Sequence, residues 1–458
     1  MNQPLSGDEP AYMLMDYSVA HDGTFNLSKG YNDKAFQSFT PGSPTIEGSP
    51  APGTQAPAKD YSQHGIGLPL FLLPGFSLGT LLTSSVHLAA RYGAVLEMLL
   101  LATGVIVLTW IWTNEVTKNR RVAYIASGLL AISYFFSGLA GYIYPDMLTS
   151  ALLLGAMIMV ERYYSTLLLQ ILLGIILGFL VLVHIKTLDL VAPVLLVLSY
   201  KLWKTNHRLP WATFLVVALF VAYYFISYHQ WFGVWGIQTA NGSGGSQFGD
   251  NPLMSVSAMM FDSFRGFLVY NPVMILIFLG LPVWFKKSPK SLGVALVATL
   301  PSIAVLSYFF QWNGGDAPLG RYIIDVLPVY IPALAFAIEI LTRSWEKVFI
   351  VLASLATFLI TVDATFGRFP LIDPGLEANM TRSPLFIQLQ QHTGLAIDRF
   401  LPMASQYLFY HTTFIDKHGL MKTIFWWLVV LAFFIYGIYL ARGRGHKAPV
   451  KKRLGATL

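Results

Sequence analysis

Long apolar stretches separated by short polar segments make up the chain from about residue 66 to residue 441. A helix needs about 20 apolar residues to cross the hydrocarbon core of a bilayer. Eleven stretches approach or reach this length, two of them rather short, and they cover roughly 91–112, 122–143, 147–161, 165–183, 187–203, 211–230, 267–285, 291–310, 322–343, 347–365 and 423–441. The pattern therefore predicts an all-α polytopic membrane protein with about 11 transmembrane helices.

The segment from Gly65 to Val86 is a further apolar stretch, but prolines and glycines interrupt it. Pro69 and Pro74 lie within it, together with several glycines. Because these residues weaken a continuous membrane-crossing helix, we expect the segment to be re-entrant or to lie on the membrane surface.

The first 65 residues contain no apolar run of this kind and differ in charge from the rest. Seven acidic residues stand against three lysines, and the stretch from Thr40 to Pro57 holds five prolines and three glycines, which favours a flexible loop. An amphipathic helix is expected from about Ala11 to Ala20. We divide the chain into an acidic loop segment, a transmembrane domain and a basic tail, which cover residues 1–65, 66–441 and 442–458.

The composition excludes a soluble enzyme. Of the 458 residues, 55% are hydrophobic and 12% are charged, whereas roughly a quarter of the residues in a soluble domain are charged. Cysteine is absent, so the chain has no disulfide and no thiolate ligand for a metal ion.

Lysine and arginine gather in five clusters that fall on one side of the predicted membrane. The clusters are Lys118, Arg120 and Arg121; Lys201, Lys204 and Arg208; Lys286, Lys287 and Lys290; Arg343 and Lys347; and the tail from Arg442 to Arg453. Because cytoplasmic loops are enriched in these residues, this side is expected to be the cytoplasm. The 1–65 segment and the loops 231–265, 311–321 and 366–422 then lie outside. The net charge of +7 follows from this asymmetry and does not indicate a nucleic-acid partner.

An outside N-terminus requires about 60 polar residues to cross the membrane without a preceding hydrophobic segment. We therefore expect a helix upstream of Met1, which would raise the number of crossings to twelve.

Ionisable side chains near the outer ends of the predicted helices are the candidates for chemistry, because charge close to the hydrocarbon core is costly. Asp8 and Glu9 precede the helix expected from Ala11. An Asp at a helix start with Pro10 just inside is also the pattern of an N-cap without a catalytic role. The local pattern leaves both interpretations open.

Further candidates lie at the outer turns. Asp146 stands at the start of a predicted helix, where it would cap the helix or contact a bound substrate. His184 and Lys186 flank the next outer turn, where Lys186 would reach lipid headgroups or hold a phosphate. Arg265 and Arg321 stand at the heads of helices, where free amides, the helix dipole and the guanidinium fork favour an anion. Interfacial anchoring is the commoner role of a single arginine at such a position.

The segment 311–316 adds Trp312 and Asp316, a combination of aromatic and polar side chains suited to a sugar or a lipid headgroup. Together, the carboxylates and cations assigned to one outer face predict a site where a base meets a bound phosphate. The chain contains no HExxH, GxxxxGK[ST] or GxSxG motif, so nucleotide-driven chemistry has no sequence support.

Six short motifs follow one another between residues 7 and 322. They are Gly7-Asp8-Glu9-Pro10 with His21-Asp22-Gly23, His64-Gly65-Ile66-Gly67-Leu68-Pro69, Tyr144-Pro145-Asp146, Arg265-Gly266-Phe267 with Asn271-Pro272, Trp312-Asn313-Gly314-Gly315, and Gly320-Arg321-Tyr322. In this order and spacing they resemble the bacterial GT-C class of membrane glycosyltransferases, in a branch similar to glycosyltransferase family 39.

The resemblance implies an inverting enzyme of the bacterial cytoplasmic membrane that moves a hexosyl or pentosyl group from a polyprenyl-phosphate carrier to an acceptor hydroxyl at the outer face. The acceptor would be a lipid-linked or cell-envelope glycan. By position in the motif, Asp8 takes the role of catalytic base, with Glu9 as its partner. The residues expected to bind substrate are Asp146, His184, Lys186, Arg265, Trp312, Asp316 and Arg321.

Two features depart from the family pattern. The helix that should precede the acidic pair is absent, and the pair is Asp-Glu instead of the Asp-x-Asp of some branches. We therefore assign no metal ligand and no defined cofactor, and leave dependence on a divalent metal open.

A polytopic transporter or lipid-carrier flippase without glycosyl transfer is the alternative function. Such a protein should show internal repeats whose broken helices place ionisable groups near mid-membrane. Glu97 and Asp189 do lie within predicted spans, but each is within about two turns of a span end.

Overall fold

The computed structural model describes residues 8–35, 39, 61–62, 64–82, 86–162, 166–232, 252–263, 266–308, 321–366, 384–394, 396–402 and 417–443, and the regular elements in these ranges are all helices. In chain order they are α1 (Glu9–Asp22), α2 (Ser28–Asn32), α4 (Gly67–Leu82), α5 (Val86–Thr117), α6 (Arg120–Ala131), α7 (Tyr134–Ser137), α8 (Pro145–Arg162), α9 (Leu167–Val183), η1 (Ile185–Thr187), α10 (Leu188–Asn206), α11 (Trp211–Phe232), α12 (Pro252–Phe261), α13 (Phe267–Tyr270), η2 (Pro272–Ile275), α14 (Leu276–Lys287), α15 (Pro289–Tyr308), α16 (Arg321–Ile324), η3 (Leu327–Tyr330), α17 (Ile331–Ile340), α18 (Ser344–Phe366), α20 (Pro384–Thr393), η4 (Ile397–Phe400) and α22 (Lys417–Gly443). The η elements are short 3-10 turns.

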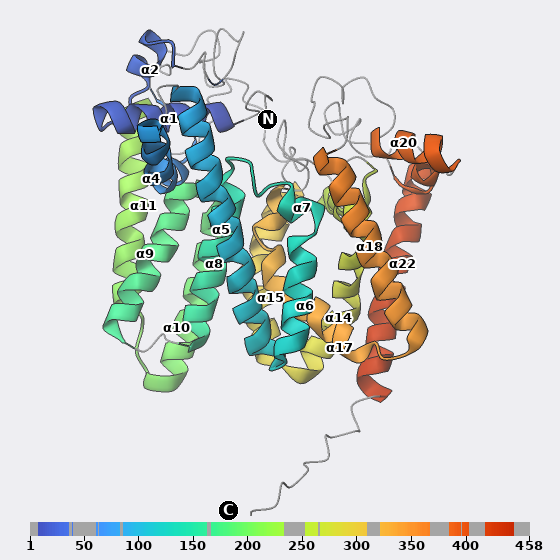
Figure 1. Ribbon diagram of the computed structural model, residues 1–458. Helices are drawn as coiled ribbons and strands as arrows, with labels where there is room; N and C mark the ends of the chain where they lie inside the picture. Colours follow the sequence, from blue (N-terminus) through green and yellow to red (C-terminus); the bar gives the residue numbers. More distant parts are fainter. Residues whose placement is uncertain are drawn as a thin grey trace, which may run out of the picture.

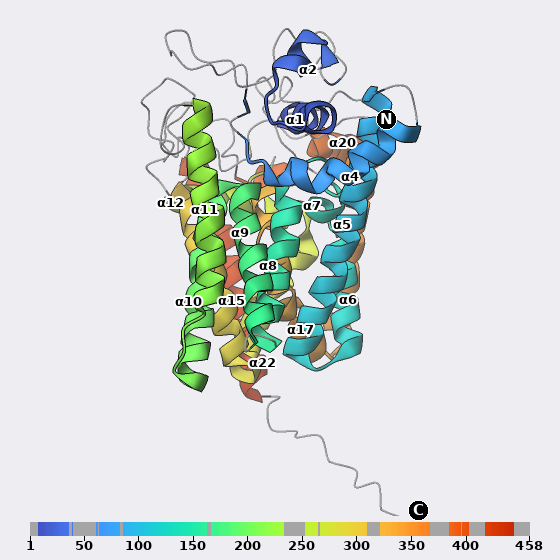
Figure 2. The ribbon, with the colours of Figure 1, turned by 90° about the vertical axis from the view of Figure 1, so that its left-hand side faces the viewer.

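The long helices form a bundle, and α1 lies across one of its ends. Figure 1 shows α1 perpendicular to α5, α9 and α11, and Figure 2 shows it end-on. Helix α4, which is continuous although Pro74 lies within it, also runs across the bundle at this end in Figure 2. We call this end of the bundle the α1 end.

Five of the described helices are long and apolar enough to cross a membrane. They are the parts Arg91–Thr117, Trp211–Phe232, Pro289–Tyr308, Ser344–Asp363 and Leu420–Gly443 of α5, α11, α15, α18 and α22. Each of the eleven stretches expected from the apolar pattern contains helix. The all-helical membrane architecture is therefore confirmed, while the number of crossings stays a prediction.

Three of the expected long helices are broken. The one expected over 267–285 is divided into α13, η2 and α14. The helix expected over 122–143 stops at Ala131, because Ser133 takes an extended backbone and the N–H of Tyr134 donates to Oδ1 of Asn271 at 2.8 Å. The helix expected over 322–343 is divided into α16, η3 and α17. Pro328 and Pro332 stand in the first turns of η3 and α17, where the missing N–H of proline is tolerated.

The expected amphipathic helix from Ala11 to Ala20 is found as α1, but its amphipathic character is wrong. Every residue from Glu9 to Ser18 is buried, so α1 is enclosed instead of resting on one apolar face. Asp16 is 0% exposed, and neither of its carboxylate oxygens has a hydrogen-bond partner among the described residues. Burial, reinforced by the negative charge of Glu97, raises the pKa of Asp16 well above its usual range.

Basic turns gather at the end of the bundle opposite α1. The α5–α6, α14–α15 and α17–α18 turns and the last turns of α10 and α22 lie there in Figure 1, and they carry the described members of the five basic clusters. Lys201 pairs with Glu161 and Lys287 with Glu339 at this end. We call it the basic end.

The contact between α14 and α17 requires a glycine at position 280. A Cβ atom at Gly280 would overlap the backbone carbonyl of Ala333, so the two helices approach more closely than a side chain allows. By contrast, a Cβ atom at Gly293 in α15 would have no neighbouring atom within 4 Å.

Gly280→Ala is expected to destabilise the fold by about 1–3 kcal/mol, because the added methyl group must push α14 and α17 apart. Gly293→Ala, the control, should be neutral or stabilising by about 0.5–1 kcal/mol, as alanine is the better helix former. Thermal unfolding in detergent measures both, and equal melting temperatures for the two variants would contradict the close helix contact.

The protonation of Asp16 predicts a pH dependence of stability. Between the pKa of Asp16 in the unfolded chain and its raised pKa in the folded protein, the folded state binds one more proton, so this group makes stability fall as pH rises. The melting temperature of Asp16→Asn relative to the wild type should therefore increase from pH 5 to pH 8. Asp22→Asn, on the exposed end of α1, is the control, and a difference that does not change with pH would show that Asp16 is ionised in the folded protein.

Candidate active site

Asp8 directs its carboxylate across the α1 end instead of capping its own helix. It occupies the N-cap position of α1, but its side chain makes no capping hydrogen bond. Its Oδ2 accepts a hydrogen bond from Nη1 of Arg321 at 3.1 Å, and its Oδ1 lies 3.9 Å from Nε2 of His64. The side chain is 19% exposed, so the carboxylate is partly open to solvent.

Arg321 begins α16 and lies between two carboxylates and two aromatic rings. Its Nε is 3.7 Å from Oδ2 of Asp146, and this buried Nε makes no hydrogen bond within the part of the chain that the structure describes. The guanidinium carbon is 4.9 Å from the ring centres of Tyr144 and Tyr322, in the range of cation–π contacts. The rings therefore hold the guanidinium while leaving donor capacity in its fork.

Lys186 continues the cluster on the other side of Asp146. Its Nζ lies 3.3 Å from Oδ1 of Asp146 and 3.3 Å from Oδ2 of Asp325. The same ammonium stands 4.3 Å from the ring centre of Tyr322. The result is an alternating row of charges, in the order Asp8, Arg321, Asp146, Lys186 and Asp325. We call these five side chains the ion row.

The environment of Asp8 keeps it ionised. Burial alone would raise its pKa, but a protonated His64, the charge of Arg321 and the hydrogen bond from Arg321 lower the pKa below its usual value. Burial lowers the pKa of His64 below 6.5, so this imidazole is neutral at pH 7. The positive charge facing Asp8 at neutral pH is therefore that of Arg321.

The turn at His184 presents one cation and one neutral ring. Nδ1 of His184 accepts the backbone N–H of Lys186 at 3.1 Å, and burial together with the charges of Lys186 and Arg321 lowers the pKa of His184 well below 6.5. Burial would lower the pKa of Lys186 as well, but Asp325 and Asp146 raise it above its ordinary value. Lys186 is therefore a fixed cation.

Hydrogen bonds between distant segments hold the broken helix that carries Arg321 and Asp325. Oγ of Ser150 in α8 donates to the carbonyl of Ile324 at 2.5 Å. Nε1 of Trp112 in α5 donates to the carbonyl of Val329 at 3.0 Å. Because α16 has only four residues, these two contacts fix the positions of Arg321 and Asp325.

Glu9 follows Asp8 in the chain and is the first residue of α1. It is 3% exposed, and its Oε1 accepts the backbone N–H of Ile143 at 2.8 Å. This hydrogen bond ties the start of α1 to the segment just before α8.

The structure brings together Asp8, Asp146, His184, Lys186 and Arg321, which are five of the residues predicted from the sequence. The predicted residues Arg265, Trp312 and Asp316 lie outside the described residues, as do most of the loops 231–265, 311–321 and 366–422. Within the described ranges, no group of three or more His, Asp or Glu side chains is arranged to hold a metal ion.

Sequence analysis missed Asp325, Tyr144 and Tyr322 as members of the site, and did not select His64. Asp325 stands four residues after Arg321, and its Oδ1 is buried with no hydrogen-bond partner in the described ranges. The spacing of four residues from Arg321 could have identified Asp325 as a member of the site. Asp325 was not selected because it lies in the stretch 322–343, which was predicted to be one continuous span.

Removing Lys186 is expected to leave the carboxylates of Asp146 and Asp325 buried without their shared cation. Lys186→Met should destabilise the protein by about 3 kcal/mol. Burial raises the pKa of Asp325 to about 8 even beside Lys186, so without the lysine this carboxyl must take up a proton. Adding Asp325→Asn removes that cost, and the double variant should recover part of the loss. A double-mutant cycle of unfolding free energies measures the coupling, and additive effects of the two substitutions would disprove the ion pair.

No known protein family's sequence profile matches the chain, and no curated protein sequence matches it. Among solved structures, ArnT from Cupriavidus metallidurans bound to undecaprenyl phosphate is similar with a TM-score of 0.48 and 15% identity, over 96% of this chain and 74% of that chain. The apo state of the same protein is similar with a TM-score of 0.46 and 14% identity, over the same shares of the two chains. The Archaeoglobus fulgidus oligosaccharyltransferase in its apo form gives 0.40 and 14%, over 92% of this chain and 60% of that chain. At these values the similarity assigns neither a substrate nor a reaction to the chain.

Proposed function

We propose that the protein is an inverting membrane glycosyltransferase that moves a sugar from a polyprenyl-phosphate carrier to an acceptor hydroxyl. The observation that carries the proposal is the ion row at the α1 end, where the partly exposed carboxylate of Asp8 meets the cations Arg321 and Lys186. The motifs that resemble GT-C glycosyltransferases contain three members of this row, Asp8, Asp146 and Arg321.

Asp8 acts as the general base in this proposal. Its carboxylate is ionised and 19% exposed, so it is ready to accept a proton from an acceptor hydroxyl as that oxygen attacks the anomeric carbon. A donor phosphate that takes over Nη1 of Arg321 would remove the hydrogen bond that now lowers the pKa of Asp8. Binding of the donor would thereby raise the basicity of the carboxylate at the moment when it is needed.

Arg321 and Lys186 hold the phosphate and stabilise the charge that grows on it as the glycosidic bond breaks. The unbonded Nε of Arg321 shows that its fork has donors to spare. Both cations are fixed by aromatic rings and carboxylates, so little reorganisation is needed during the reaction. Asp146 and Asp325 orient the cations and keep the unliganded site close to neutral.

An apolar cavity of about 170 Å³ next to Tyr322 would take the first part of the isoprenoid chain. Its walls come from α12, α13, α14, α15 and the α16–η3 segment, and they include Met260, Phe278, Ile303 and Tyr330. Tyr322 borders the cavity, and its ring also contacts Lys186. A polyprenyl phosphate placed there has its tail among apolar side chains and its phosphate at the two cations.

The α1 end is proposed to face the outside of the bacterial cytoplasmic membrane. The basic turns stand at the opposite end (Figure 1), and such turns are retained on the cytoplasmic side. The acceptor is then a lipid-linked or cell-envelope glycan, and the transferred group a hexose or a pentose.

The distribution of buried charge favours a transferase over a transporter or flippase. Among the described residues, the buried charged side chains lie in α1, in the ion row or near helix ends, as with Asp262 after α12 and Glu346 at the start of α18. Glu97 accepts the backbone N–H of Gly75 in α4, which holds it close to the α1 end. A transport pathway instead requires ionisable groups near mid-membrane.

Asp8→Asn is expected to lower transfer by about 10² to 10⁴, because the amide does not accept the proton, while binding of undecaprenyl phosphate is retained. Arg321→Ala should weaken both sugar transfer and the binding of undecaprenyl phosphate. Turnover is measured in reconstituted vesicles with a panel of radiolabelled polyprenyl-phosphate hexoses and pentoses.

Asp22→Asn is the control, since it removes an exposed carboxylate of the same helix. Full activity of Asp8→Asn would refute the assignment of the base. Movement of intact carrier across the bilayer, without release of lipid phosphate, would instead identify a flippase.

A further inference from the structure

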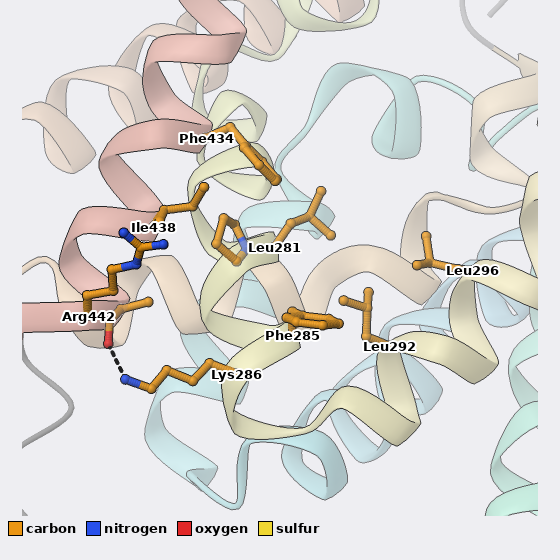
Figure 3. A pocket seen from close by; sticks show the side chains of 10 residues that line it. Leu281, Phe285, Lys286, Leu292, Leu296, Phe434, Ile438 and Arg442 are labelled. Atoms are coloured by element: carbon orange, nitrogen blue, oxygen red, sulfur yellow. Dashed lines mark hydrogen bonds between the residues drawn. The ribbon is translucent and has the colours of Figure 1, made fainter.

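A second cavity lies at the basic end, between α14, α15 and α22, and it plays no part in the proposed reaction. Figure 3 shows its lining, and its volume is about 640 Å³, within the range of small-molecule sites. Its lining is apolar except for Lys286 and Arg442. We call this cavity the basic-end groove.

The groove has a defined floor and two walls. Leu281 and Phe285 of α14 form the floor, Leu292 and Leu296 of α15 form one wall, and α22 forms the other (Figure 3). Gly437 lets α22 approach α14, because a Cβ atom there would overlap the carbonyl of Leu279. The groove is thus built by fixed helix contacts.

One end of this apolar groove carries two cations. Nζ of Lys286 donates to the carbonyl of Ala441, the residue before Arg442, at 2.7 Å, and Lys286 and Arg442 both line the groove (Figure 3). A backbone carbonyl does not neutralise the ammonium. Arg442 is exposed, and within the described part of the chain it has no hydrogen-bond or ion-pair partner.

The apolar part of the groove is open to the surroundings of the bundle. Phe285 is 65% exposed and Phe434 is 36% exposed, although both line the cavity. A large aromatic surface next to two uncompensated cations calls for a ligand that is apolar along most of its length and anionic at one end.

We propose that the basic-end groove binds one anionic phospholipid. One acyl chain lies along Phe285, Leu296 and Phe434, and the phosphate stands between Lys286 and Arg442. The other basic turns share this end of the molecule, so the headgroup lies in the leaflet that the positive-inside rule assigns to the cytoplasm, where anionic lipids attract basic residues. A free phosphate would leave the apolar length of the groove unused.

Native mass spectrometry of the full-length protein in detergent tests the proposal, with palmitoyl-oleoyl phosphatidylglycerol and palmitoyl-oleoyl phosphatidylcholine as probes. The wild type should bind one phosphatidylglycerol at least about tenfold more tightly than phosphatidylcholine. Lys286→Gln combined with Arg442→Gln should remove this preference. Lys204→Gln combined with Arg208→Gln, which also removes one lysine and one arginine at the basic end, should leave the preference intact.

A groove-filling variant separates the acyl chain from the headgroup. Leu296→Trp should weaken binding of both lipids, because the indole occupies the space of the chain. Equal binding of the two lipids by the wild type, or unchanged phosphatidylglycerol binding in the Lys286/Arg442 variant, would overturn the proposal. A third outcome is that the wild type is a dimer, that Leu296→Trp is a monomer, and that the variant keeps its bound lipid. The groove would then be the contact with a second copy of the chain, and the proposal would be overturned as well.

Discussion

The ion row is the constraint on which the rest of the site depends. Isolated charges this deeply buried would be strongly unfavourable, so each carboxylate and each cation is kept in place by the opposite charges beside it. The row joins four segments that are far apart in sequence, namely the start of α1, the start of α8, the η1 turn and the α16 segment. A change at any member therefore affects both the assembly of the α1 end and the electrostatics that any ligand meets there.

The broken helices explain how the bundle can display this row. A continuous helix over 322–343 would bury the backbone groups around Arg321 and Asp325 in its own hydrogen bonds and direct their side chains by helical periodicity alone. The division into α16, η3 and α17 frees the carbonyl of Ile324 for Ser150 and that of Val329 for Trp112. Two side chains from the long helices α8 and α5 thus anchor an irregular segment, whose residues Ile324, Asp325 and Val329 are buried within the protein.

The architecture was largely readable from the sequence, because apolar stretches of sufficient length have few other uses. The sequence also predicted that five of the selected polar residues would lie together. The distribution of Lys and Arg gave a topology independent of these residues, and that topology placed their turns on one side of the membrane. The helix break after Ala131 was not predictable, because the apolar pattern continues through it and its cause, the acceptor from Asn271, is 137 residues away in sequence. The enclosure of α1 was missed for the same reason. Its burial depends on what covers it, and no property of Glu9–Asp22 alone reports that cover.

Cross-linking with a polyprenyl phosphate that carries a photoreactive diazirine next to the phosphate tests the central claim most directly. The account predicts label on the peptides that contain Tyr144–Asp146 and Arg321–Asp325, and protection of both by excess undecaprenyl phosphate. Label confined to α14 and α22 at the basic end would contradict it, because the carrier phosphate would then bind far from Asp8 and from both cations of the ion row.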